Sequence, residues 1–195
     1  MGIDQKIKIQ KRAVFFDQDG TVIKHVDLLI DVKDIKILPG VVTAIRRLRQ
    51  LGFLVIVITN QPVVARGLIS ENGVKVLEKR ISWLLSQKGA LVDDFFFCPH
   101  HPEATLKKYR VKCQCRKPAP GMILKAAKRY NIDLKNSFMV GDALIDSVAG
   151  HRAGVKTILV KTGPGHSKLD KIYKEEKPDK VVKKIYEAVK LICEK

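Results

Sequence analysis

Two acidic residues, Asp17 and Asp19, stand one residue apart between the apolar segment Ala13–Phe16 and Gly20. In an extended chain, residues i and i+2 point to the same face, so these two carboxylates are expected to lie side by side. Like charges held that close destabilise each other unless a cation or a proton intervenes. Because Gly20 also permits a sharp turn, the segment indicates a site for a divalent metal and a phosphate, with one carboxylate available as a nucleophile. A strand that ends in a solvated acidic turn is the alternative interpretation.

Polar side chains also follow two other apolar segments farther along the chain. Val55–Ile58 runs directly into a hydroxyl and two amides, and Phe138–Val140 runs into a glycine and an acid, with a second acid four residues later. Between them, a lysine precedes Pro118, just ahead of an expected helix. In chain order, these polar residues are Thr59, Asn60, Gln61, Lys117, Asp142 and Asp146.

The four segments form an ordered set: Asp-x-Asp-Gly-Thr, Thr-Asn-Gln, Lys-Pro and Gly-Asp-x-x-x-Asp. Together they resemble the four motifs of the haloacid dehalogenase superfamily of phosphatases. The resemblance implies that Asp17 attacks phosphorus and forms an aspartyl-phosphate, and that Asp19 protonates the leaving alcohol and then activates water. It also implies magnesium, held by Asp17, by the backbone carbonyl of Asp19 and by Asp142. Asp146 would then support these ligands from an outer position.

The same resemblance implies how the substrate is held. The hydroxyl of Thr59 and the backbone amide of Asn60 would bind the phosphoryl oxygens, and Lys117 would neutralise their charge. An ordinary surface lysine before a proline is the alternative for Lys117. The further candidate substrate contacts are His25, Gln61, Arg66 and Arg116.

Two pairs of metal-ligand residues, Cys98 with His100 and Cys113 with Cys115, lie between the second and third motifs. Three thiols and one imidazole are what a closed tetrahedral structural zinc site requires. His101 is adjacent and could replace His100, and an unligated mobile loop is the alternative interpretation. With Cys-Arg-Lys-Pro beside it, this loop resembles the one in the D-glycero-D-manno-heptose 1,7-bisphosphate phosphatases and the related histidinol-phosphatases.

The chain departs from that subfamily at several positions. We expect these positions to contact the substrate more than to take part in the reaction itself. Gln18 stands where the family commonly has arginine, and Pro62-Val63 stand where it has Ser-Gly. The bacterial heptose phosphatases carry Asp-His-Gly-Tyr where this chain has residues 25–28, and lysine where it has Ala143. These differences leave the phosphatase prediction intact and weaken the heptose prediction.

The composition fits a single domain, residues 1–195, with the Cys/His loop at residues 98–115. A chain of 195 residues can bury a full core, and 46% hydrophobic residues is ordinary for a globular protein. No run of about 18 apolar residues indicates a membrane span, and Met1–Arg12 lacks an apolar signal core. Three of the four cysteines belong to the expected zinc site, which favours a reducing compartment over a disulfide scaffold. We expect a cytoplasmic monomer.

The formal net charge of +17 is partly concentrated around the third motif. Residues 104–132 contain nine Lys or Arg and no Asp or Glu, so a basic surface beside the reacting groups should attract a small anionic substrate. A nucleic-acid partner is the competing explanation. In residues 168–195, nine Lys are interleaved with six acids, which is typical of the solvated face of a terminal helix.

The elements that must position these residues alternate between strand and helix. Strands are expected at 13–16, 53–58, 95–97, 137–140 and 157–160, and helices at 40–50, 70–88, 120–130, 142–153 and 180–193. This alternation predicts an α/β fold with a single doubly wound parallel sheet, in which ligands bind at the carboxyl ends of the strands. The short spacings between the motifs leave no room for a separate cap domain.

The leading prediction is a magnesium-dependent phosphatase that acts on a small sugar phosphate. D-glycero-D-manno-heptose 1,7-bisphosphate, cleaved at the C7 phosphate, is the first candidate, and histidinol phosphate is the second. A nucleic-acid 3′-phosphatase would share the first two motifs and suit the charge, but the Cys/His loop argues against it. A non-enzymatic RNA-binding or scaffold protein is disfavoured, because all four motifs are intact and no aromatic-rich basic platform is present.

Overall fold

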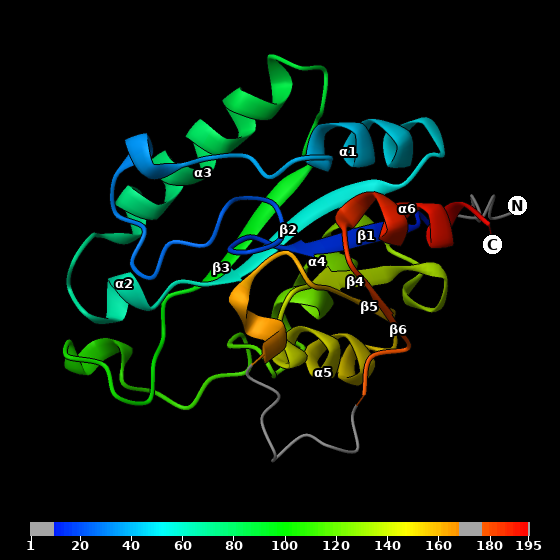
Figure 1. Ribbon diagram of the computed structural model, residues 1–195. Coiled ribbons are helices and arrows are strands. Elements are labelled where there is room, and N and C mark those ends of the chain that lie inside the picture. Colours follow the sequence, from blue (N-terminus) through cyan, green and yellow to red (C-terminus); the bar gives the residue numbers. More distant parts are fainter. Residues whose placement is uncertain (1–9, 168–176, 195) are drawn as a thin grey trace, which may run out of the picture.

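One parallel sheet of six strands forms the centre of the described molecule, residues 10–167 and 177–194 of this computed structural model (Figure 1). The strands lie in the order β3-β2-β1-β4-β5-β6, and every neighbouring pair is parallel. Their bounds are β1 Ala13–Asp17, β2 Leu54–Asn60, β3 Asp94–Cys98, β4 Phe138–Gly141, β5 Lys156–Val160 and β6 Lys180–Val182. The arrangement confirms the predicted α/β fold with a single parallel sheet.

Helices cover both faces of the sheet, as Figure 1 shows. The helices on one face are α1 (Val41–Gln50), α3 (Glu71–Ser86) and α6 (Ile185–Cys193). Those on the opposite face are α4 (Gly121–Tyr130) and α5 (Leu144–Ala153). The short helical segments are α2 (Pro62–Ala65), η1 (Val32–Asp34), η2 (Lys107–Tyr109), η3 (Leu134–Asn136) and η4 (Pro164–Ser167).

The central strands β1, β2 and β4 are apolar up to their carboxyl ends because both faces of the sheet are buried. Alternate residues of a strand point to opposite faces. In β1, Val14 and Phe16 join the core under α1, α3 and α6. Ala13 and Phe15 join the core under α4 and α5. The sheet is therefore doubly wound, as predicted.

The predicted terminal helix at 180–193 is wrong over its first residues, because Lys180–Val182 form strand β6, which pairs with β5. Distant contacts hold the chain there. The Asp179 carboxylate accepts hydrogen bonds from the backbone N–H of Thr157 (2.7 Å) and from its hydroxyl (3.0 Å), and it lies 3.2 Å from Nε2 of His151. Only α6 satisfies the helical prediction. Residues 168–176, to which the interpretation as a solvated face also applied, lie outside the described residues.

The connections around the sheet carry short elements and loops. Between β1 and β2 the chain forms η1 and α1, and between β2 and α4 it forms α2, α3, β3 and the Cys/His loop. No folded cap domain occurs in these connections, all of which the structure describes, in agreement with the sequence-based expectation. In the same described parts of the chain, no helix combines the length and apolar character that crossing a bilayer needs.

Candidate active site

The carboxyl ends of β1, β2 and β4 meet at one edge of the sheet and bring the sequence motifs together. Asp17 ends β1, Thr59 lies at the penultimate position of β2, and Asp142 directly follows β4. Strands β2 and β3 lie on one side of β1, and β4, β5 and β6 lie on the other. In parallel α/β sheets, ligands bind in the crevice at the point where the strand order reverses in this way. A cavity of ≈ 180 Å³ opens there, lined by Asp17, Asp19, His25, Thr59, Asn60, Lys117, Asp142, Ala143, Ile145, Asp146, Pro164 and Gly165. We call it the acidic cavity.

Lys117 is buried between two of these carboxylates. Its Nζ forms an ion pair with Oδ1 of Asp17 and a second one, at 2.7 Å, with Oδ1 of Asp146. The same Nζ donates to the carbonyl oxygen of Ile58 at 3.2 Å. Burial opposes the charge on the ammonium, but the carboxylates of Asp146 and Asp17 outweigh burial and raise the pKa of Lys117 above its ordinary value. A positive charge is therefore held against Asp17 at neutral pH.

The side chain of Asn60 fixes the backbone of Lys117. Its Nδ2 donates to the carbonyl oxygen of Lys117 at 3.0 Å, and its Oδ1 accepts from the backbone N–H of Lys117 at 3.0 Å. These reciprocal bonds join the end of β2 to the segment that precedes α4. The sequence predicts a role only for the backbone amide of Asn60, and the structure adds this positioning contact for its side chain.

Two carboxamides hold Asp19. Nε2 of Gln18 lies 3.2 Å from Oδ2 of Asp19, and Nε2 of Gln61 lies 3.4 Å from the same oxygen. Gln61 also donates to the hydroxyl of Thr59 at 3.1 Å. Burial raises the pKa of Asp19 to about 6, although His25, Lys117 and the two amides oppose the rise. A carboxyl group that titrates close to neutral pH is suited to giving and taking a proton during a reaction.

Three carboxylates, those of Asp17, Asp142 and Asp146, lie close enough to share a cation. One oxygen of each lies within 4.8 Å of the others, and all three residues are buried. Burial raises the pKa of Asp17 well above its usual range, with Lys117 opposing and the neighbouring acids adding to the rise. Burial also raises the pKa of Asp142. These directions indicate negative charge that Lys117 alone does not compensate, so the residues fit a hard divalent cation.

The remaining predicted substrate contacts divide into those at the site and those away from it. His25 lines the acidic cavity, with its Nε2 3.1 Å from Oδ1 of Asp27. Gln61 is buried between Thr59 and Asp19 and is not among the residues that line the cavity. Arg66 is exposed and does not line the acidic cavity.

A cleft of ≈ 510 Å³ adjoins the acidic cavity, and Lys117 lines both. Its other lining residues are Pro102, Arg110, Val111, Lys112, Cys113, Arg116 and Pro118, and we call it the basic cleft. The guanidinium of Arg110 donates to the carbonyl oxygen of Ala104 through Nε (2.9 Å) and Nη2 (2.7 Å). Nη1 of Arg116 donates to the carbonyl oxygen of His100 at 3.0 Å. Both cations are therefore fixed in place by backbone carbonyls.

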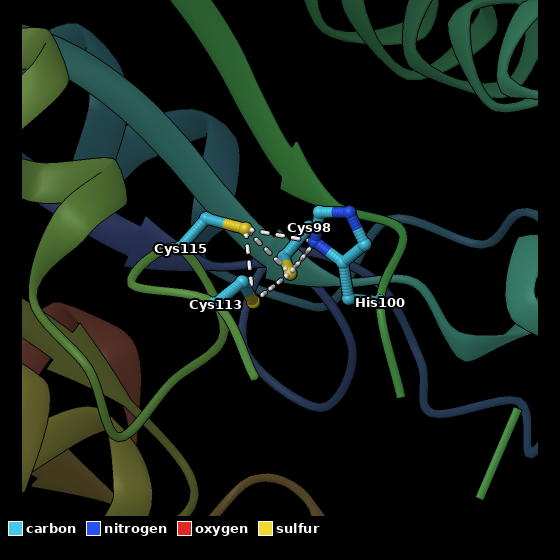
Figure 2. A group of neighbouring side chains, drawn as sticks. All are labelled: Cys98, His100, Cys113 and Cys115. Atoms are coloured by element: carbon cyan, nitrogen blue, oxygen red, sulfur yellow. Dashed lines mark hydrogen bonds between the residues drawn. The ribbon is translucent and has the colours of Figure 1, made fainter. Parts of the chain in front are cut away.

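The four predicted zinc ligands converge, as Figure 2 shows. The ligand atoms of Cys98, His100, Cys113 and Cys115 all lie within 4.8 Å of one another. Sγ of Cys98 is 2.8 Å from Sγ of Cys115 and 3.6 Å from Nδ1 of His100, and Sγ of Cys113 is 3.3 Å from Sγ of Cys115. All the cysteines are unbridged. Three sulfurs and one ring nitrogen arranged in this way fit a closed tetrahedral metal site.

The Cys/His loop is anchored to the rest of the molecule. The backbone N–H of Leu106 donates to the carbonyl oxygen of Ala65 in α2 at 3.0 Å, and the hydroxyl of Tyr109 donates to Oε1 of Glu71 in α3 at 2.9 Å. Nδ1 of His101, the alternative ligand, accepts from the backbone N–H of Glu103 at 3.1 Å. The metal-binding group contains His100 rather than His101.

The loop that follows β5 also contributes to the site, and the sequence motifs do not include it. Pro164 and Gly165 line the acidic cavity, and the backbone N–H of Gly165 donates to Oδ2 of Asp142 at 2.8 Å. The hydroxyl of Thr162 donates to the carbonyl oxygen of Gly20 at 2.6 Å. A signal was present, because Thr-Gly-Pro-Gly comes just after a strand whose carboxyl end was expected to face a ligand.

Known proteins with similar sequences are named as phosphatases. A family model described as "HAD-hyrolase-like" matches residues 114–188. The D-glycero-beta-D-manno-heptose-1,7-bisphosphate 7-phosphatase of Rhodopseudomonas palustris is 44% identical over 147 residues, which are 75% of this chain and 81% of that protein. The enzyme of the same name from Yersinia pestis is 38% identical over 152 residues, 77% of this chain and 81% of that protein.

Solved structures show the same relationship. The crystal structure of D,D-heptose 1.7-bisphosphate phosphatase from B. bronchiseptica, complexed with magnesium and phosphate, superposes with a TM-score of 0.80 and 32% identity. The match covers 94% of this chain and 98% of that one. The corresponding enzyme from Burkholderia thailandensis gives a TM-score of 0.69 and 25% identity, and covers 95% of this chain and 100% of that one.

The fold, the buried acidic site and these similarities define a haloacid dehalogenase-like phosphatase, a phosphoric monoester hydrolase. Within that class, the chain belongs to the family that includes the D-glycero-beta-D-manno-heptose-1,7-bisphosphate 7-phosphatases.

Proposed function

We propose that this phosphatase is magnesium-dependent and removes one phosphate from a small sugar bisphosphate. The specific candidate is D-glycero-D-manno-heptose 1,7-bisphosphate, cleaved at the C7 phosphate. The observation that carries the proposal is the adjacency of the acidic cavity and the basic cleft, which share Lys117. A site for one phosphate beside a fixed cluster of cations suits a substrate with a phosphate at each end. The names of the relatives support this choice.

In the proposed reaction, a carboxylate oxygen of Asp17 attacks phosphorus in line with the ester oxygen. The P–O bond to the sugar breaks, and Asp19 gives its proton to the departing alkoxide. Asp19, now a carboxylate, takes a proton from a water molecule that attacks phosphorus and breaks the aspartyl-phosphate bond. Inorganic phosphate leaves, Asp17 is regenerated, and the water proton restores Asp19 to its acid form. The pKa of Asp19, raised to about 6 by burial, supports both proton transfers.

The other residues of the site bind and orient the substrate. Thr59 and the backbone amide of Asn60 would hold the phosphoryl oxygens, and Lys117 would neutralise their charge. Magnesium, held by Asp17, Asp142 and the backbone carbonyl of Asp19, would supply a second compact positive charge. Asp146 would keep Lys117 in place through their ion pair. Substrate specificity would come from His25 and Arg116, which line the two cavities, and from Gln61, which acts through Thr59 and Asp19.

We also propose that residues 1–195 form one phosphatase domain, with the Cys/His loop as its zinc-binding element. The shared sheet, which carries residues of the first, second and fourth motifs, supports the single domain, and the ion pair of Lys117 with Asp17 ties the third motif to it. The unbridged cysteines support a reducing compartment, the cytoplasm, and the protein is expected to act as a monomer. Zinc held by four protein ligands leaves no open position for substrate, so its role would be to fix Arg116 and Lys117 at the mouth of the site.

Cys113→Ser is expected to abolish zinc binding and to lower phosphatase activity without abolishing it. The purified wild type should contain about one zinc ion per chain, because four ligands form one tetrahedral site. The loop would loosen, whereas the reacting aspartates would stay on the sheet. Elemental analysis and turnover measurements check this, with Cys193→Ser in α6 as the matched control. Full zinc content in Cys113→Ser, or none in the wild type, would contradict the zinc assignment.

The substrate proposal predicts that Arg116→Gln selectively impairs hydrolysis of a bisphosphate. Glutamine keeps a donor for the His100 carbonyl and removes the charge that would hold the distal phosphate. Charge-assisted hydrogen bonds contribute about 1.5–3 kcal/mol, so kcat/KM for heptose 1,7-bisphosphate should fall at least about tenfold. Hydrolysis of p-nitrophenyl phosphate, which has no second phosphate, should change little. Arg80→Ala, in α3 and lining neither the acidic cavity nor the basic cleft, is the control and should affect neither substrate.

A screen over heptose 1,7-bisphosphate, histidinol phosphate and a 3′-phosphorylated oligonucleotide tests the substrate class. Efficient turnover of the sugar bisphosphate supports the proposal. Preference for histidinol phosphate would move the assignment to that substrate within the same mechanism. Oligonucleotide binding that weakens steeply with salt, together with 3′-dephosphorylation and no turnover of sugar phosphates, would replace it with a nucleic-acid phosphatase.

A further inference from the structure

Backbone segments from two loops enclose the carboxylate of Asp142. The N–H of Gly165 donates to Oδ2 of Asp142 at 2.8 Å. A Cβ atom added to Gly163 would lie 2.2 Å from the same oxygen, and one added to Gly20, in the turn after β1, would lie 2.7 Å from it. The hydroxyl of Thr162 donates to the carbonyl oxygen of Gly20 at 2.6 Å. The loop after β5 and the turn after β1 are therefore tied together around Asp142.

Space, rather than backbone conformation, requires glycine at positions 163 and 165. Neither glycine has the positive φ that disfavours other residues. A Cβ atom at Gly163 would lie 2.6 Å from Cα of Gly20, and one at Gly165 would lie 2.7 Å from Cβ of Ala143. These separations are too short for real contacts, so alanine at either position must displace Asp142 or the loop itself.

We propose that Thr162, Gly163 and Gly165 are positioning residues that hold the carboxylate of Asp142 for magnesium binding. The Gly165 N–H engages Oδ2 and so restricts rotation of the carboxylate. Hydrogen bonds to a ligand carboxylate orient it and tune metal affinity. The inference rests on the proposed function, in which Asp142 is a magnesium ligand, and assigns to the loop after β5 a role that the four sequence motifs do not contain.

Calorimetric titration with Mg²⁺ alone, without substrate, tests the proposal. The Kd for Mg²⁺ is expected to rise at least about tenfold in Gly163→Ala, the lower end of the effect of losing an outer contact to a ligand. Thr162→Val, which removes one hydrogen bond and adds no bulk, should raise the Kd by a smaller factor. Thr162→Ser keeps the hydroxyl and should bind Mg²⁺ as the wild type does.

Gly154→Ala is the control for general destabilisation. Gly154 ends α5 with φ of 82°, and nothing lies within 4 Å of an added Cβ atom. Alanine there should lower the melting temperature through backbone strain and leave the Kd for Mg²⁺ unchanged.

Wild-type Mg²⁺ affinity in both Gly163→Ala and Thr162→Val would overturn the inference while leaving the proposed function standing. An equal loss of affinity in Gly154→Ala would also overturn it, because the effect would then be general. If Gly163→Ala does not fold, Thr162→Val decides. A wild type that binds no Mg²⁺ would remove the proposed function, and this inference with it.

Discussion

Replacement of Asp17 by asparagine is expected to lower kcat/KM for phosphate monoesters at least about a hundredfold, the scale on which a reacting group is lost. An amide oxygen is a poor nucleophile and cannot form the aspartyl-phosphate. The neighbouring Lys117 would keep its ion pair with Asp146, so the fold should survive and the loss should appear in kcat. Steady-state kinetics with saturating Mg²⁺ check this, and excess chelator should abolish the wild-type activity.

Asp19→Asn separates the two halves of the same mechanism. Its effect should depend on the leaving group. p-Nitrophenolate can depart as an anion, whereas a sugar alkoxide must receive a proton as it leaves. With p-nitrophenyl phosphate, rapid mixing should show a burst of about one equivalent of product per chain, since the phosphorylated enzyme accumulates when no base activates water. Asp34→Asn, an exposed acid in η1, is the matched control and should behave as the wild type.

For the first prediction, an Asp17→Asn variant with more than about a hundredth of wild-type activity would contradict the nucleophilic role of Asp17.

Lys117→Met is expected to destabilise the protein by about 3–5 kcal/mol in the absence of divalent metal, the effect of breaking a buried ion pair by removing one partner. Methionine occupies a similar volume but leaves Asp17, Asp142 and Asp146 crowded without their cation. Urea denaturation measures the free energy of unfolding, and Lys128→Met, an exposed lysine of α4, is the control.

Mg²⁺ should restore part of the stability of Lys117→Met, because it can take over the role of the missing positive charge among the same carboxylates. Activity should remain low even at saturating Mg²⁺, since the phosphoryl group loses the ammonium that neutralises it. If Lys117→Met is as stable as the wild type in metal-free buffer, the three carboxyl groups are not all ionised at the same time. That result would contradict this account of the site.

The positions of the candidate reacting groups could be predicted from the sequence because they depend on a local rule. Asp17, Thr59 and Asp142 each stand at the end of an apolar strand, and parallel strands bring their carboxyl ends to one edge of a sheet. The four residues of the Cys/His cluster were equally visible, because two close pairs of potential metal ligands need only one loop to bring them together. These predictions required no knowledge of which side chain contacts which.

The tertiary structure alone decided the contacts between distant segments, which leave no periodic pattern in the sequence. The reciprocal bonds of Asn60 with the backbone of Lys117 span 57 residues, and the bond from Thr162 to Gly20 spans 142. Strand β6 was missed for the same reason, because three residues carry too little local preference without the neighbouring edge of β5 and the contacts of Asp179. The sequence by itself determined which polar residues stand at the ends of the strands and are the candidates for the reaction. Packing between segments far apart in the chain determined how those groups are held.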